Sequence, residues 1–325
     1  MRKIDIRQLF CVAFGLWTEE ARRMPVGGQA VIEGVLMKGS ELWGLAVRKP
    51  DGEIFRESWR NSSRVGNRPW SLPILRGVVV MCEMMATGFR ALSRSAEIAL
   101  EETQETLGLR DLVVAIGTAV LAVMLLFVAL PLWAADWTAR LFSLSPLGAN
   151  ILEGIVRAAV FVGYVGLIGL WSDIRRVFRY HGAEHKTINA FEGGMEMAPA
   201  NIAWCSRIHP RCGTSFLLIA VIVSIAVFSA IGSGGFLWRV GTRVLLIPLV
   251  IGVSYEIIRL TANAGPIGRL LMAPVLSLQY LTTREPDLDQ IEVALTSLNV
   301  ALGRETSDSA ASEAIHKSET ERDPV

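Results

Sequence analysis

Long runs of apolar residues dominate the middle of the chain and predict helices that cross a membrane. A crossing helix needs about 20 mostly apolar residues. Runs with few or no charges predict four such helices, at Leu112–Trp133, Ile151–Trp171, Ser215–Trp238 and Val244–Ile258. The fourth run is short for an untilted crossing, so a buried or tilted helix fits it as well.

The residues before these runs show short alternating stretches that are typical of β-structure. Leu42–Arg48 and Glu53–Trp59 flank Lys49-Pro-Asp-Gly52, which favours a tight turn. We therefore expect a small β-hairpin or sheet module at residues 25–71, preceded by an N-terminal interfacial segment at residues 1–24. Residues 72–110 mix charges with Val, Met and Leu, which predicts an amphipathic helical region on the membrane surface or against the spans.

The residues after the last span predict interfacial and amphipathic helices at 261–302 and a disordered tail at 303–325. Arg269 and Pro274 interrupt the apolar run Ile267–Tyr280, as in a short re-entrant or interfacial helix. Leu288–Leu302 carries one apolar stripe, whereas the tail is too polar to order itself. The predicted fold is a mainly α-helical integral membrane protein, with about four transmembrane helices at 111–260 and a small N-terminal β element.

Composition and charge support this prediction and give an orientation. Hydrophobic residues make up 51% of the chain, charged residues only 19%, and the mean hydropathy is +0.41, which is unlike a soluble enzyme. Arg and Lys gather in the N-terminal region and between the second and third spans, which predicts a multi-pass protein of the cytoplasmic membrane with both termini cytoplasmic. We expect membrane lipids and an unknown small-molecule, lipid or peptide substrate as partners, no nucleic acid, and leave a homo-oligomer open.

The candidate chemistry lies in the sequence His181-Gly-Ala-Glu184-His185. On a helix, positions i, i+3 and i+4 share one face, so the two imidazoles and the carboxylate converge. The order H-x-x-E-H matches the inverzincin pattern, in which two His hold zinc and the Glu activates a bound water. We therefore predict His181 and His185 as metal ligands and Glu184 as the catalytic base, in a cytoplasmic His/Cys metal loop at residues 172–214.

Three further residues extend the predicted site. His209 and Cys212 are three residues apart and offer ligand types that suit Zn²⁺ or Fe²⁺. Glu256 lies inside an apolar run, where an ionisable group usually has a partner or a function, and inverzincins take their third ligand from a downstream Glu. We therefore predict all three as ligands. For Cys212, a nucleophile with His209 as its base and a plain packed thiol remain alternatives.

Five stretches of the chain form a specific combination of motifs. They are Gly27-Gly-Gln-Ala-Val-Ile-Glu-Gly-Val-Leu-Met-Lys-Gly39, Tyr180-His-Gly-Ala-Glu-His-Lys186, His209-Pro-Arg-Cys-Gly-Thr-Ser-Phe216, Tyr255-Glu-Ile-Ile-Arg259 and Leu281-Thr-Thr-Arg-Glu-Pro286. With these motifs the chain resembles the YqhQ-like family of bacterial membrane proteins, the domain of unknown function 1385, over roughly Met24 to Leu302. The resemblance implies a membrane location and a suspected metal-dependent enzyme, and it implies no substrate.

The function expected from these features is hydrolysis at the cytoplasmic membrane face of a lipid-linked or membrane-adjacent substrate, with Zn²⁺ or Fe²⁺ as cofactor. The alternative is a non-catalytic metal-stabilised scaffold or assembly factor, in which four ligands close a tetrahedral site with no open position, namely His181, His185, His209 and Cys212. A transporter is less favoured because the predicted spans hold few polar groups. Basic residues near the motif suit an anionic headgroup, although the positive-inside rule explains them equally: Arg175, Arg176, Arg179, Lys186 and Arg211.

Overall fold

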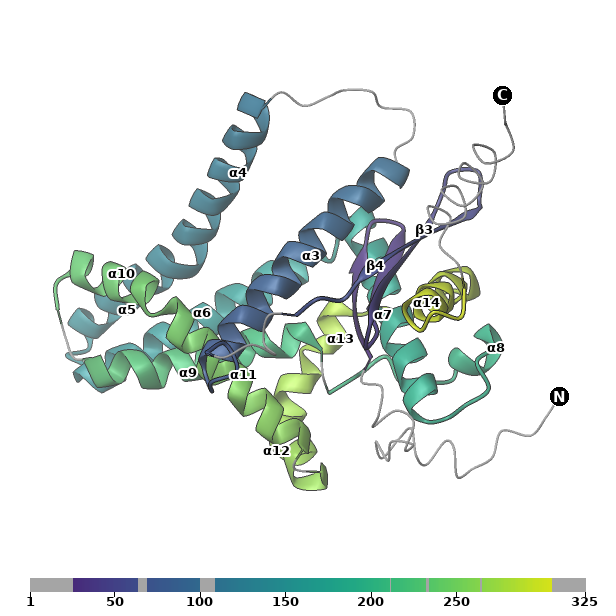
Figure 1. Ribbon diagram of the computed structural model, residues 1–325. Helices are drawn as coiled ribbons and strands as arrows, with labels where there is room; N and C mark the ends of the chain where they lie inside the picture. The colour runs from purple at the N-terminus through teal and green to yellow at the C-terminus, as the bar shows by residue number, and fades with distance from the viewer. Residues whose placement is uncertain are drawn as a thin grey trace, which may run out of the picture.

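The computed structural model describes residues 26–63, 69–99, 109–210, 212–231, 234–263 and 265–305. The interfacial segment expected at 1–24 and nearly all of the tail expected at 303–325 lie outside these residues. The described residues form a helical bundle at one end and a small sheet packed between helices at the other (Figure 1).

A four-stranded antiparallel sheet, in the order β1-β2-β3-β4, forms the N-terminal part. Its strands are β1 (Gly27–Val31), β2 (Gly34–Lys38), β3 (Leu42–Arg48) and β4 (Ile54–Arg60). The register pairs Arg48 with Ile54, so the predicted turn joins β3 to β4, and Gly52 in that turn has a φ of +91°. The expectation of a small N-terminal β element is confirmed, and the sheet consists of three consecutive hairpins.

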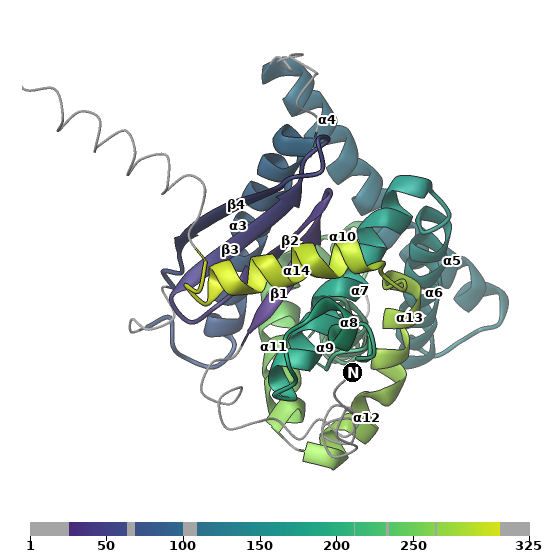
Figure 2. The same ribbon diagram turned by 90° about the vertical axis from the view of Figure 1, so that its right-hand side faces the viewer.

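Helices cover both faces of this sheet. Helix α3 (Leu75–Ala99) packs on one face, where its Ala91 meets Leu36 and Leu45. Helices α7 (Ser172–Glu192) and α14 (Leu288–Ala301) pack on the other face. Figure 2 shows α14 lying across the strands, with α3 behind them. Because both faces are covered, β2 and β3 carry apolar residues at nearly every position rather than at alternate ones.

The bundle contains the long apolar helices. In chain order they are α4 (Leu109–Met124), a π-helical turn η2 (Leu125–Ala129), α5 (Leu130–Leu141), α6 (Pro146–Ile168), α9 (Gly213–Ile231), α10 (Phe236–Leu245) and α11 (Ile247–Asn263). Within the described residues, three helices are long and apolar enough to cross a membrane, at Gly117–Leu141, Leu147–Ile168 and Gly213–Ile231. A fourth crossing is counted only if α10 and α11, which meet at a 48° bend, act as one span.

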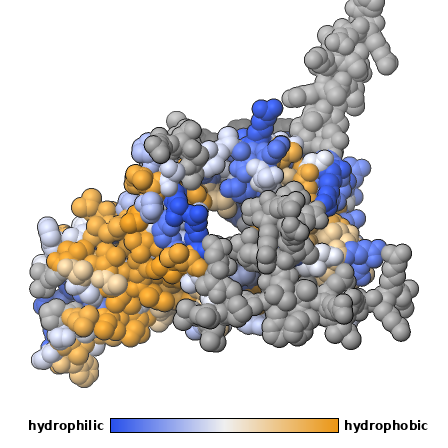
Figure 3. Space-filling view, turned by 60° about the horizontal axis from the view of Figure 1, so that its bottom comes forward, coloured by the Kyte–Doolittle hydropathy of each residue, from blue (hydrophilic) through white to orange (hydrophobic). Residues whose placement is uncertain are grey.

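The surface of the bundle is apolar, as a lipid-facing surface requires. Exposed side chains there include Leu125, Leu167 and Ile222, each more than half exposed. Figure 3 shows the hydrophobic residues gathered over this end of the molecule, while hydrophilic residues gather toward the sheet. A patch of this extent is unusual on a soluble monomer and is consistent with membrane association.

Charged residues inside the bundle are paired with one another. Glu153 of α6 accepts hydrogen bonds from Arg157 on the same helix and from Arg243 of α10. Both guanidinium groups also lie over the ring of Phe228 on α9. Glu256 is therefore not the only charged group with a polar contact inside the bundle, because the contacts of Glu153 with Arg157 and Arg243 join α6 to α10. The cation–π contacts of both arginines with Phe228 add α9.

The last helices return the chain from the bundle to the sheet. They are α12 (Gly265–Ser277), α13 (Gln279–Thr282) and α14, with a short α8 (Pro199–Ile202) beside α14 and α7. Residues 283–287 between α13 and α14 cross α7 closely, where the Arg284 amide donates to the Phe178 carbonyl at 2.8 Å. This crossing brings the end of α13 next to the H-x-x-E-H turn.

Candidate metal centre

Helix α7 carries the H-x-x-E-H motif in its second half. The first half of the helix is largely exposed, whereas Tyr180 and most of the residues from Gly182 to Glu192 are buried. The helix ends where Gly194 adopts a φ of +64°, a left-handed conformation that suits glycine. The motif therefore sits on a rigid, buried stretch of helix, where its side chains have defined positions.

The structure brings three of the predicted ligands together. The ligand atoms of His181, His185 and Cys212 all lie within 4.8 Å of one another. His181 Nε2 is 3.2 Å from Cys212 Sγ, and the two imidazole ring centroids are 4.4 Å apart. Among the residues that the structure describes, this is the one group of three His, Cys, Asp or Glu side chains close enough to share a metal ion.

Backbone carbonyls fix the orientation of both imidazoles. His181 Nδ1 lies 2.8 Å from the Thr282 carbonyl oxygen, and His185 Nδ1 lies 2.6 Å from that of Arg207. A carbonyl only accepts hydrogen bonds, so both Nδ1 atoms carry a proton, and in the neutral form of either imidazole Nε2 is the atom that can bind a metal. Metal-binding imidazoles are commonly held in this way.

Two buried atoms of the motif have no hydrogen-bond partner among the described residues. They are His185 Nε2 and Glu184 Oε2. A buried polar atom without a partner costs about 1–3 kcal/mol, so such atoms need an explanation. A metal ion bound by two imidazole nitrogens and a thiolate would satisfy His185 Nε2, and that donor set suits Zn²⁺ or Fe²⁺. The residues present therefore fit a metal ion.

The electrostatics favour a thiolate at Cys212. Burial alone would raise the pKa of this thiol, but the positive charges of His181 and His185 and the hydrogen bond with His181 hold it well below its usual range. Burial likewise disfavours a charge on His181, yet the neighbouring Cys212 raises the pKa of that imidazole to about 9. The thiolate is the form of cysteine that binds metals.

Glu184 lies beside this cluster and under strand β1. Burial raises the pKa of its carboxyl group, and the charges of His181 and His185 act in the opposite direction. Gly28 of β1 lies so close that a Cβ atom there would be 2.9 Å from Glu184 Oε1. A glycine at this position therefore lets the sheet cover the carboxylate.

The structure directs His209 away from the group of three. Its Nε2 lies 3.2 Å from Glu192 Oε2, and its ring centroid is 5.9 Å from that of His185. Burial lowers the pKa of His209 to about 4, so the ring is neutral and donates to the Glu192 carboxylate. His209 thus lies next to the cluster but is held by another carboxylate.

The structure places Glu256 in a different contact. Its carboxylate on α11 is bound by the guanidinium of Arg76 on α3, with Arg76 Nε 2.6 Å from Oε1. The amide of Ile74 approaches the same oxygen at 3.4 Å. Glu256 is not part of the group formed by the two imidazoles and Cys212. Its contacts instead fasten the start of α3 to the bundle.

Several residues for which the sequence predicted no supporting role hold the site in place. Buried Gln279 pairs with the backbone of His209 in both directions and also donates to Ser215, so it fixes the loop that presents Cys212. Lys186 and Asn189 on α7 donate to carbonyl groups between residues 203 and 208. The sequence signal that could have indicated the role of Gln279 is its polar amide inside the apolar run Ile267–Tyr280.

Gly182 inside the motif is needed for close packing. A Cβ atom at this position would overlap the Arg284 carbonyl oxygen. The segment after α13 can therefore cross α7 at this turn, and the Thr282 carbonyl reaches His181. The glycine is thus linked to the orientation of the imidazole.

Comparisons with known proteins agree on one relationship. The family model described as "Protein of unknown function (DUF1385)" matches residues 72–304. The chain is 36% identical over 292 residues to the "Uncharacterized protein YqhQ" of Bacillus subtilis (strain 168), a match that covers 85% of this chain and 92% of that protein. No solved structure matches.

Proposed function

Because the chain belongs to the DUF1385 family, whose description assigns no activity, we propose a function from the site itself. The protein is a metal-dependent hydrolase that acts at the cytoplasmic face of the cell membrane on a lipid-linked or membrane-adjacent substrate. It crosses the membrane several times with both termini cytoplasmic. His181, His185 and Cys212 hold Zn²⁺ or Fe²⁺, and Glu184 is the general base.

One observation carries this proposal. His185 Nε2 is buried and has no hydrogen-bond partner among the described residues, although its Nδ1 is bound to a backbone carbonyl at 2.6 Å. Simple packing would leave the cost of that nitrogen unexplained, whereas a bound metal removes it. The same ion would bind the thiolate of Cys212, which otherwise needs a protonated imidazole beside it.

The number of ligands supports catalysis over a structural role. Structural zinc sites have four protein ligands, whereas catalytic sites have three and keep one position open. The cluster has three, and the nearest further imidazole, His209, is bound to Glu192. When bound, the metal supplies a Lewis acid that makes water a nucleophile near neutral pH. Glu184 accepts the proton of the attacking water and passes it to the leaving group.

A second candidate is covalent catalysis by Cys212. The thiol lies 3.2 Å from His181 Nε2, within reach of a general base, and its pKa is lowered. This arrangement pairs the thiol with His181 rather than with His209. It assigns no role to His185 Nε2, which is why we favour the metal.

The test is the metal content of the detergent-purified full chain, measured by elemental mass spectrometry. We expect about one Zn or Fe per wild-type chain. His185→Ala and Cys212→Ala should lose it, whereas Glu184→Gln should keep it. Cys82→Ser is the matched control, because Cys82 is an exposed thiol outside the cluster.

Activity is then followed without a known substrate. Wild type and Glu184→Gln are incubated in vesicles of total bacterial lipid, and new products are sought by mass spectrometry. A product that needs both the metal and Glu184 supports the hydrolase. If the wild type binds metal but forms the same products as Glu184→Gln, the result supports the non-catalytic scaffold. If the folded wild type is active without metal and the Cys212→Ala variant is inactive, the result supports covalent catalysis instead.

A further inference from the structure

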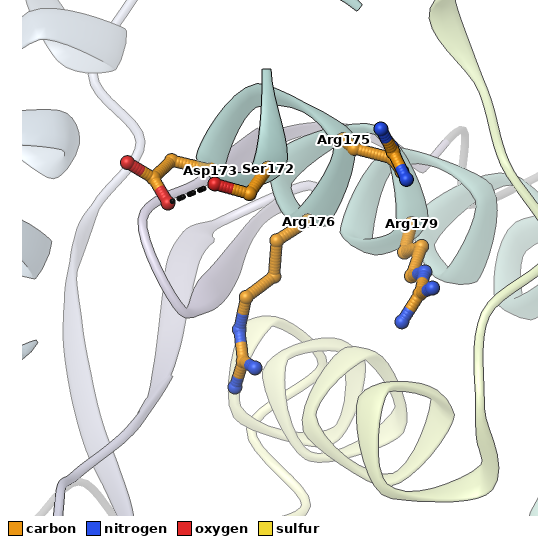
Figure 4. A pocket seen from close by; sticks show the side chains of 5 residues that line it. All are labelled: Ser172, Asp173, Arg175, Arg176 and Arg179. Carbon is orange, nitrogen blue, oxygen red and sulfur yellow. Dashed lines mark hydrogen bonds between the residues drawn. The ribbon is translucent and has the colours of Figure 1, made fainter. Parts of the chain in front are cut away.

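A pocket lined by arginines lies at the start of α7, away from the metal centre. It is a half-open surface pocket of about 340 Å³, lined by Ser172, Asp173, Arg175, Arg176 and Arg179. Figure 4 shows the three arginine side chains extending from two successive turns of the helix. Positions 175 and 179 share a helix face, as do 176 and 179, and all three arginines line the pocket.

The charges of this pocket are only partly used by the protein. Arg176 forms an ion pair with Glu33 of the β1–β2 turn, and Arg175 donates to the Leu170 carbonyl. Asp173 accepts from Ser172. Within the part of the chain that the structure describes, neither Arg175 nor Arg179 has an ion-pair partner. Three guanidinium groups against the carboxylates of Asp173 and Glu33 leave one positive charge in excess.

The surroundings of the pocket are apolar on the side of the bundle. Helix α6, one of the possible spans, ends at Ile168, only four residues before α7 begins. Leu167, Leu170 and Trp171 at this junction are 70%, 67% and 68% exposed. Tryptophan beside the end of a span is typical of a membrane interface. The pocket thus lies where a lipid headgroup meets the protein if α6 crosses the membrane.

The ligand that suits these features has a phosphate group and an apolar part. Guanidinium groups bind phosphate through paired charge-assisted hydrogen bonds. The positive-inside rule requires basic residues on the cytoplasmic side, but it does not require them to line one cavity. The exposed Leu and Trp side chains provide the surface on which acyl chains would lie.

We propose that this pocket binds the phosphate headgroup of an anionic phospholipid. The proposal rests on the membrane location in the proposed function and is independent of the metal. Bound lipid holds the exposed first half of α7 against the membrane surface, at a fixed distance from the buried H-x-x-E-H turn on the same helix.

Native mass spectrometry of the full chain in detergent tests the proposal. Phosphatidylglycerol and phosphatidylcholine with identical acyl chains are titrated onto wild type and onto the double variant Arg175→Gln/Arg179→Gln. Two arginines beside an anionic lipid headgroup together strengthen its binding about thirtyfold. Wild type should therefore bind phosphatidylglycerol about thirtyfold more tightly than phosphatidylcholine, and the double variant should bind both equally. Arg110→Gln, which removes an exposed charge at the start of α4, is the matched control and should behave as wild type.

Three outcomes would overturn the proposal. They are a wild type without preference for phosphatidylglycerol, a double variant that keeps the preference, and an Arg110→Gln variant that loses the preference as fully as the double variant does.

Inorganic phosphate is added as a competitor. If phosphate displaces the lipid at a concentration close to that of the lipid, the pocket is assigned to free phosphate instead. Metal content is measured on the same samples. Loss of the preference with metal retained is expected of the double variant, and absence of metal in a wild type that prefers phosphatidylglycerol contradicts the metal proposal alone.

Discussion

The substitution Gly182→Ala tests how the metal centre depends on backbone packing. The new Cβ atom would overlap the Arg284 carbonyl oxygen, which would have to move by about 1.3 Å to reach an ordinary C···O distance of roughly 3.3 Å. Thr282 lies two residues before Arg284, and its carbonyl accepts from His181 Nδ1 at 2.8 Å. When the Arg284 backbone moves, the Thr282 carbonyl two residues away moves with it. A shift of about 1 Å at Thr282 breaks its hydrogen bond with His181, because N–H···O distances beyond about 3.2 Å are already weak.

Loss of this hydrogen bond releases the orientation of His181. Substitutions in such supporting contacts weaken metal binding about 10- to 100-fold, which corresponds to about 1.4–2.7 kcal/mol. The assay is competition for zinc with a chromophoric chelator, using the full chain in detergent. Gly166→Ala on α6 is the control, since a Cβ atom there contacts nothing within 4 Å. Unchanged zinc affinity in Gly182→Ala, together with an unchanged melting temperature, would refute the reasoning.

Three further outcomes are expected. Gly28→Ala should displace the carboxylate of Glu184 and reduce metal-dependent turnover with little effect on metal content, whereas Gly27→Ala, which contacts nothing, should behave as wild type in the same assays. Glu256→Gln should keep the metal and lower the melting temperature, because it weakens the ion pair with Arg76; loss of metal would instead return Glu256 to the ligand set. A chelator should lower the melting temperature of the wild type, since a metal at 1,000 times its Kd stabilises the folded state by about 4 kcal/mol, and a melting curve that does not respond would contradict a bound metal.

The parts of the fold that depend on local patterns could be predicted from the sequence. The Pro-Asp-Gly turn between β3 and β4 and the apolar runs of α6 and α9 follow from short stretches of the chain. The spacing of His181 and His185 predicted a shared helix face, and both lie on α7 with adjacent rings. Their role as ligands stays a prediction, since no measurement tests it.

The remaining contacts depend on backbone atoms that are far apart in the sequence. The Thr282 and Arg207 carbonyls that orient the imidazoles have no side-chain signature, so no motif could reveal them. The apolar run around Glu256 correctly indicated that this carboxylate has a partner. It could not indicate which one, because Arg76 and the two imidazoles were equally compatible with the sequence. Only the packing of α3 on α11 distinguishes them.

The position of the candidate ligands suggests why a metal would matter to the whole molecule. His181 and His185 lie on α7, which packs on the sheet, whereas Cys212 stands directly before α9 of the bundle. A metal bound to all three would therefore join α7 directly to the start of α9. Its ligand geometry would respond to any movement of α7 relative to α9, and the arginine pocket lies on that same helix at the end of α6. A lipid bound there would fix the first half of α7, while the metal would fix the turn that carries Glu184, so a shift of the helix would act on both sites.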